Sequence, residues 1–117
     1  MDGNYTLYDL TVEVLPLRPG AQFVCRHTVG VAFTVTDDDI ITFQPGASFT
    51  MYGLAALLIL LPAKQRPTQE FDWMTSDNDI ACPDPECGAR FRIVRGAARE
   101  YLRSENTATP FPADATA

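Results

Sequence analysis

The sequence predicts one small α+β domain in which a mostly antiparallel sheet packs on one buried apolar helix. Three observations lead to this prediction. Several short segments alternate apolar and polar residues, which is typical of strands with one buried face. Residues 54–61 are wholly apolar, which is typical of a helix buried on more than one side. The length of 117 residues and the hydrophobic content of 46% fit a single domain with its own core.

The alternation is clearest in residues 8–17, where Leu10, Val12 and Val14 would share one face of a strand. Three consecutive acidic residues, 37–39, are interpreted as the tip of a hairpin, because no flanking pattern resembles a calcium loop. Similar patterns predict further extended segments at 22–27, 31–36, 40–43 and 89–94.

The apolar helix is expected to run from about Thr50 to Leu61, with Ser48 or Thr50 as its N-cap. The apolar run is too short for a membrane span, which needs about 20 residues, so no membrane association is expected. A single sheet covers only one side of such a helix. The other side is expected to be buried against a second copy of the chain, which predicts a homodimer.

The domain is expected to cover residues 1–103, with a short basic helix at 96–103. Residues 104–117 are polar and rich in proline and cannot bury enough apolar surface to become ordered. They are therefore predicted to form a disordered tail.

The net charge of −6 argues against nucleic-acid binding, which needs a basic face to neutralise phosphates. The charge is uneven, because residues 90–103 hold five arginines and one acid, Glu100. This segment is either a local anion site or a solvated basic face.

The three cysteines are an odd number, which argues against a closed set of disulfides. The first residues show no basic and apolar signal sequence. Both observations predict a soluble cytoplasmic protein with reduced thiols.

The chemistry of the chain is expected at its single histidine. His27 follows Cys25 by two residues, so both would point to the same face of an extended segment, and Cys82 is expected to converge on them. A thiolate beside an imidazole can act as a nucleophile or as an acid–base pair. The sequence therefore predicts a protein that binds or transforms a small organic molecule, such as a carboxylate, by isomerase or lyase chemistry if it is an enzyme. The residues expected to bind this molecule are Arg92, Trp73 and Tyr52.

Two alternatives to this site remain open. The cysteines and the histidine can be inert core residues, or Cys25, His27, Cys82 and Cys87 can hold a structural zinc ion. The spacing does not favour zinc, because the usual paired ligands have about two to four residues between them, whereas these pairs have one and four. No cofactor is therefore expected, and the zinc alternative describes a structural or protein-interaction module.

The chain resembles a family of small, mostly bacterial proteins known only as an uncharacterised (TIGR-type) repeat protein. The resemblance covers about residues 8–95 and rests most on the closing motif 82–85, Cys-Pro-Asp-Pro, followed by 91–93, Phe-Arg-Ile. It also includes Cys25 and His27 before Gly30 and Phe33, and the apolar helix.

The chain departs from this family at three points. Val31 stands where the family favours aspartate, the Cys–His spacing is shorter, and residues 43–45 replace a Cys-Pro before the helix. The resemblance implies the domain boundaries and the choice of site residues, and it brings no established activity.

Overall fold

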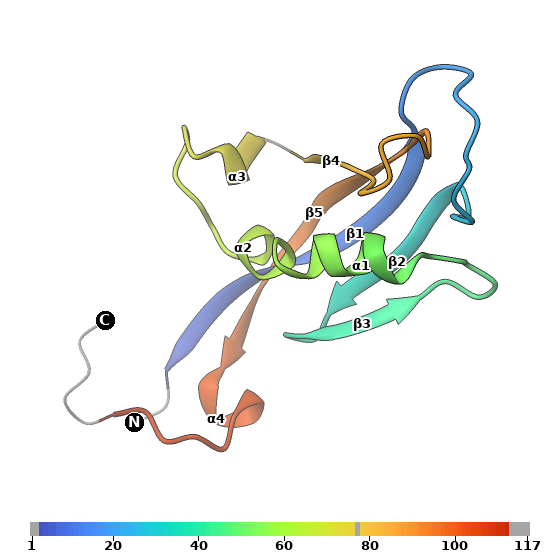
Figure 1. The fold of residues 1–117 in the computed structure, drawn as a ribbon. Helices are drawn as coiled ribbons and strands as arrows, with labels where there is room; N and C mark the ends of the chain where they lie inside the picture. Colours follow the sequence, from blue (N-terminus) through green and yellow to red (C-terminus); the bar gives the residue numbers. More distant parts are fainter. Residues whose placement is uncertain (1–2, 77, 113–117) are drawn as a thin grey trace.

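The computed structural model describes residues 3–76 and 78–112 and contains a five-stranded antiparallel sheet with short helices on one face (Figure 1). The strand order is β3-β2-β1-β5-β4. This architecture confirms the predicted α+β class. The elements are β1 (Asn4–Pro16), β2 (Gly30–Thr36), β3 (Ile40–Phe43), α1 (Met51–Leu58), α2 (Leu61–Gln65), α3 (Trp73–Ser76), β4 (Asp79–Ala81), β5 (Ala89–Leu102) and α4 (Arg103–Asn106).

The two longest strands, β1 and β5, form a ribbon that runs through the whole molecule (Figure 1). Its pairing extends from Asn4 opposite Leu102 to Pro16 opposite Ala89. The prediction of a basic helix at 96–103 is therefore wrong, because nearly all of this segment belongs to β5. Its backbone groups pair with those of β1, and this ladder outweighs the local helix preference of the sequence.

The predicted hairpin between β2 and β3 is confirmed, with its tip at residues 37–39. Asp37 and Asp38 have positive φ angles of 50° and 76°. Aspartate tolerates this left-handed conformation better than most residues, because its short side chain can hydrogen-bond locally. The acidic triplet thus has a conformational role in the turn.

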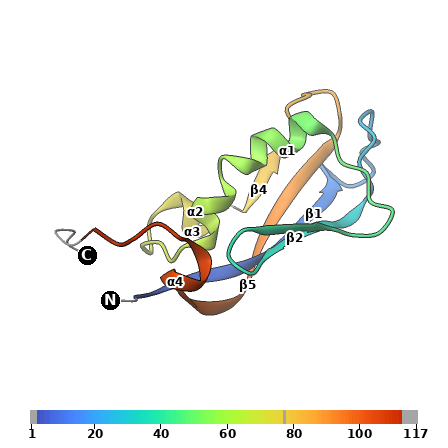
Figure 2. The same ribbon diagram turned by 90° about the horizontal axis from the view of Figure 1, so that it is seen from below.

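The helices lie on one face of the sheet, which Figure 2 shows from below, and the core lies between them and the sheet. Leu10, Val12 and Val14 of β1 are each at most 1% exposed, which confirms the face predicted for this strand. Phe91 of β5 and Phe33 of β2 complete the centre of the core. Alternation along each strand places these side chains on one face and polar side chains on the other.

The apolar segment forms two short helices instead of one buried helix. Thr50 is the N-cap of α1, as expected, and its Oγ1 accepts a hydrogen bond from Gly53 N at 3.0 Å. Gly53 and Leu57 are buried, whereas Met51 and Ile59 are 72% and 80% exposed. The helix packs on the sheet by one stripe only, because a single layer of sheet covers one side of it.

Two further segments differ from the expectations. Residues 17–29 connect β1 to β2 without regular structure, so the extended segment expected at 22–27 is not a strand. In the predicted tail, α4 covers Arg103–Asn106, and Asn106 Nδ2 donates to Leu102 O at 2.9 Å. Residues 113–117 of the predicted tail lie outside the described residues. Among the helices described, none is long and apolar enough to cross a membrane.

Candidate metal centre

Three cysteines and the single histidine meet at one end of the sheet. One ligand atom from each of Cys25, His27, Cys82 and Cys87 lies within 4.8 Å of all the others. Cys25 Sγ is 3.8 Å from Cys82 Sγ, and Cys82 Sγ is 4.0 Å from His27 Nε2. The predicted convergence of His27 and Cys82 is thus present, and the fourth member of the cluster is Cys87.

Two irregular segments bring these residues together, the β1–β2 connection (17–29) and the β4–β5 connection (82–88). Backbone hydrogen bonds join them, since Leu17 N donates to Gly88 O and Val24 N donates to Cys87 O, both at 2.8 Å. The approach is so close that a Cβ on Gly88 would lie 2.2 Å from Gln22 O. Gly88 also has a φ of +85°, a conformation that glycine adopts without strain.

His27 is held in an aromatic pocket at the edge of the core. Its ring packs edge-on against Phe49 at 4.7 Å and against Phe91 at 4.9 Å between centroids. The side chain is 8% exposed, and its burial lowers the pKa of the imidazole. The neutral ring, which is the form that binds metals, is therefore favoured here.

The hydrogen bonding around His27 also fits a neutral ring. Thr50 Oγ1 lies 3.4 Å from Nε2, whereas Nδ1 is buried without a hydrogen-bond partner in the described part of the chain. Within residues 3–76 and 78–112, no carboxylate forms an ion pair with the ring. A buried cation would need such a partner to offset its desolvation.

The sulfur atoms receive hydrogen bonds from backbone amides two residues further along the chain. The amide of Asp84 bonds to the Cys82 sulfur, and the amide of Ala89 bonds to the Cys87 sulfur. The backbone amide of Cys25 bonds to Cys87 as well. Donors of this kind orient metal-bound thiolates and disperse their negative charge.

Without a bound cation, the proximity of the three thiols makes it harder for all of them to lose their protons together. The hydrogen bond to Cys87, followed by burial and the contact with Cys82, raises the pKa of Cys25 to about 12. Burial is the first of the causes that raise the pKa of Cys82. Burial also acts to raise the pKa of Cys87, but the hydrogen bonds from Cys25 and the backbone outweigh it and lower that pKa. Three thiolates in one place require a positive charge between them.

Two distances in the cluster are close to those of a tetrahedral zinc site. With zinc–sulfur bonds of about 2.3 Å and zinc–nitrogen bonds of about 2.0 Å, the edges of the tetrahedron are roughly 3.5–3.8 Å long. The separation of Cys25 and Cys82 falls in this range, and that of Cys82 and His27 is slightly longer. The residues present could therefore hold a metal ion such as zinc.

Of the three predicted substrate-binding residues, the structure places one beside the cluster and two away from it. Tyr52, 70% exposed on α1, lines a cavity of about 300 Å³ beside the cluster. Arg92 forms a salt bridge with Asp79 and lies next to Phe91, which faces His27, so that Arg92 points to the opposite face of β5. Trp73 is 56% exposed in α3 and does not line this cavity, whose walls are Cys25, Thr50, Tyr52, Cys82, Pro83 and Asp84.

Sequence reasoning did not identify Thr50, Phe49 and Phe91 as neighbours of His27. Their positions in the chain give no signal for this contact, since Thr50 was recognised only as a helix cap. Cys87 was recognised as a ligand of the zinc alternative, but its spacing argued against a metal. The chain has no match to a known protein family, to a curated protein or to a solved structure, so the family resemblance stays a prediction.

Proposed function

We propose that the protein is a zinc-stabilised α+β module, in which the metal is bound by Cys25, His27, Cys82 and Cys87. The observation that carries this proposal is the convergence of four soft ligand atoms within 4.8 Å. Thiolate and imidazole ligands in a set of four are the preferred environment of structural zinc. A site with four protein ligands is closed, and it leaves no position for substrate on the metal.

The metal would fasten two connections that have little regular structure of their own. Residues 17–29 and 82–88 are joined to each other by the two backbone hydrogen bonds from Leu17 and Val24. A zinc ion bound by ligands from both segments closes a long loop of the chain. Metal binding would then contribute directly to the free energy of folding.

Metal analysis of the purified full-length protein tests this proposal. We expect one zinc per chain, together with a lower melting temperature after incubation with a strong chelator. Cys87→Ser should abolish zinc binding and lower the Tm by roughly 10–15 °C, which corresponds to about 2–3 kcal/mol for a domain of this size. Glu86→Gln, an exposed change in the same loop, is the matched control and should retain zinc.

Two results would contradict the zinc proposal. One is a protein that folds with less than a tenth of an equivalent of metal when purified and after zinc is added. The other is a Cys87→Ser variant that binds zinc as wild type does.

A second candidate function is the binding or transformation of a small metabolite at the same cluster. It is supported by the cavity of about 300 Å³ that opens onto Cys25 and Cys82. In this alternative the thiols and His27 are free for acid–base or nucleophilic chemistry. The reactivity of the thiols separates the two functions, since a bound metal would protect them and a free imidazole would activate them.

The exposed side of α1 supports the prediction that the module associates with a second copy of itself. Met51, Tyr52 and Ile59 are each at least 70% exposed on or beside this helix. Several exposed apolar side chains on one helix are typical of a surface that another molecule covers. We propose a homodimer formed through this helix, because an isologous contact would bury the patch of both copies at once.

A further inference from the structure

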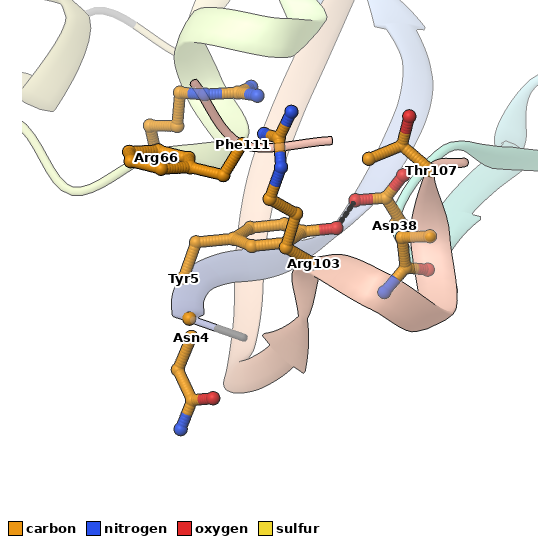
Figure 3. Close-up of a pocket in the computed structure, with 9 residues that line it drawn as sticks. Asn4, Tyr5, Asp38, Arg66, Arg103, Thr107 and Phe111 are labelled. Carbon is orange, nitrogen blue, oxygen red and sulfur yellow. Dashed lines mark hydrogen bonds between the residues drawn. The ribbon is translucent and has the colours of Figure 1, made fainter. Parts of the chain in front are cut away.

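A second cavity lies at the opposite end of the β1–β5 ribbon from the cysteine cluster. It has a volume of about 510 Å³ and is lined by residues from the start of β1, the β2–β3 turn, the end of α2 and the segment after β5 (Figure 3). Eleven positions of β1 separate Tyr5 in this cavity from Pro16 near the cluster, which is roughly 35 Å of strand. The cavity is therefore independent of the metal centre.

Three of the five arginines between residues 90 and 103 form salt bridges, which limits where an anion could bind. Asp79 forms salt bridges with both Arg90 and Arg92. Asp9 holds Arg99, with Nε 2.8 Å from the carboxylate oxygen. The basic segment is thus partly neutralised within the fold.

The remaining two arginines of the segment differ from each other. Arg95 donates to Lys64 O and Arg66 O and covers the ring of Tyr8, so its guanidinium is fully engaged. Arg103 lines the cavity and donates from Nη2 to Thr109 O at 3.1 Å, whereas its Nε is buried without a hydrogen-bond partner in the described part of the chain. Arg103 is therefore the arginine of this segment that brings a guanidinium to this cavity without being held by a carboxylate among the described residues.

A second guanidinium enters the same cavity from α2. Arg66 caps the end of that helix, and its Nη1 donates to the carbonyl of Pro62 at 2.7 Å. In the view of Figure 3, the guanidinium groups of Arg66 and Arg103 both lie above the ring of Tyr5. Within residues 3–76 and 78–112, neither arginine forms a salt bridge that would occupy it.

Aromatic side chains also line the cavity. The Arg103 guanidinium lies over the ring of Phe111, 5.3 Å from its centroid, and Tyr5 stacks on Tyr101 at 5.7 Å. Tyr5 and Phe111 both line the cavity. A planar group placed here would find aromatic surface close to two cationic groups.

Asp38, the acidic group among the described residues that line the cavity, already has a partner in the protein. Tyr5 Oη donates to Asp38 Oδ1 at 2.5 Å. Burial and this hydrogen bond raise the pKa of Tyr5 to about 12, so the phenol stays protonated near neutral pH. The carboxylate thereby fixes Tyr5 in the wall and leaves both arginines to an incoming anion.

We propose that this cavity binds a small organic anion, a phosphate monoester or carboxylate attached to a planar ring. Arg66 and Arg103 would bind the anionic group, since the planar fork of guanidinium matches both phosphate and carboxylate oxygens. Tyr5 and Phe111 would pack against the ring. The volume is within the range of about 300–1,000 Å³ that small-molecule sites have in proteins.

Isothermal titration calorimetry with the full chain tests this proposal. The probes are phenyl phosphate and benzoate, which separate the two anionic groups, and inorganic phosphate and benzyl alcohol, which each lack one half of the ligand. We expect at least one of the first two to bind with a Kd of ~1 mM or tighter, and both half-ligands to bind at least tenfold more weakly. The metal-loaded protein and a Cys87→Ser variant should bind alike, because the cavity is distant from the cluster.

Substitutions of Arg66 and Arg103 test whether these two residues bind the anionic group. Arg66→Gln and Arg103→Gln should each weaken binding by about ten- to a hundredfold, as the loss of a charged hydrogen bond does. Arg18→Gln, an exposed arginine in the β1–β2 connection, is the control and should bind as wild type. Arg66→Gln keeps the test valid if Arg103→Gln unfolds, because the one hydrogen bond described for the Arg66 side chain goes to the carbonyl of Pro62 in its own helix.

Two results would overturn the proposal. One is the absence of saturable binding of phenyl phosphate and benzoate at ~10 mM. The other is binding that Arg66→Gln and Arg18→Gln weaken equally, which would show a non-specific effect of charge.

Discussion

Cys25 Sγ lies 3.8 Å from Cys82 Sγ, although 57 positions separate the two residues in the chain. Contacts this distant in sequence are costly in chain entropy, because they close a long loop. Here the contact joins two irregular connections at one end of the sheet. The cluster therefore holds together a part of the molecule that the regular strands do not reach.

Gly88 is expected to be essential for the geometry of the cluster. Gly88→Ala should lower the Tm by roughly 10 °C or more, about 2 kcal/mol, and reduce zinc binding, because the new Cβ would lie 2.2 Å from Gln22 O. Thermal melting and metal analysis of the variant provide the measurement.

Gly20→Ala is the matched control for this substitution. Gly20 also has a positive φ, +78°, but no atom lies within 4 Å of the position of its Cβ. It should show only the backbone strain, about 1 kcal/mol, and retain its metal. Equal effects of the two substitutions would show that the close approach of Gly88 to Gln22 has no special role.

The sequence was informative wherever the local pattern and the final structure agree. The alternation of Leu10, Val12 and Val14 predicted their shared buried face, and Thr50 was one of the two residues expected to cap the helix. In both cases the decisive interactions lie within one element. Local preference and tertiary structure then point to the same answer.

The strand at residues 96–102 could not be predicted from its local sequence pattern. Ala97, Ala98 and Glu100 favour a helix, but their backbone pairs with residues 4–8, which are distant in sequence. The candidate metal centre shows the same limit. The spacing between Cys82 and Cys87 is unusual for zinc, and only the fold reveals that the β1–β2 connection brings two further ligands to them.

Asp79 should stabilise the fold in a pH-dependent manner. Its hydrogen bond with Arg92 and the charge of Arg90 hold its pKa below the ordinary value of 3.8. A carboxylate with a lowered folded pKa contributes stability above the unfolded value and loses it as the pH falls through the folded value. Asp79→Asn should therefore have a lower Tm than wild type at pH 7, and the difference should shrink below pH ~3.8.

The control for this prediction is Asp72→Asn, an exposed acid that forms no salt bridge within residues 3–76 and 78–112. The comparison uses thermal melts of the three proteins at several pH values. A difference between wild type and Asp79→Asn that stays constant from neutral to acid pH would contradict the role given to the ion pair.

The exposed patch on α1 predicts a homodimer in solution. Light scattering of the full chain at high micromolar concentration should give about twice the monomer mass of 12.9 kDa. Ile59→Glu should shift the mass to that of the monomer, because it places a charge in the proposed contact. Phe71→Glu is the control, since Phe71 is 94% exposed but lies outside the helix. A monomeric wild type would end this prediction.

Removal of residues 106–117 should separate the two roles of the segment after β5. The Tm should change by less than roughly 5 °C, about a kcal/mol for this size of domain, because residues 106–112 are exposed. Binding of phenyl phosphate should nevertheless weaken, since Phe111 lines the proposed anion site. A larger fall in the Tm would show that the contact of Phe111 with Arg103 contributes to the stability of the fold.

His27 allows the two candidate functions of the cluster to be distinguished. The measurements are the rate of modification of Cys82 by a thiol reagent at neutral pH and the Tm, for wild type and His27→Ala. In a zinc site the metal protects the sulfur, so the loss of one ligand should speed modification and lower the Tm. In a reactive site the imidazole activates the thiol, so its loss should slow modification and leave the Tm nearly intact.

We expect faster modification and a lower Tm, in accordance with the zinc proposal. The control is Thr28→Ala, which removes a neighbouring hydrogen bond that Ser48 N donates to Thr28 Oγ1 but keeps all four ligands. Slower modification with an intact Tm would favour the metabolite site. An unchanged rate with a large fall in the Tm would make His27 a core residue, packed between Phe49 and Phe91, with no part in either chemistry.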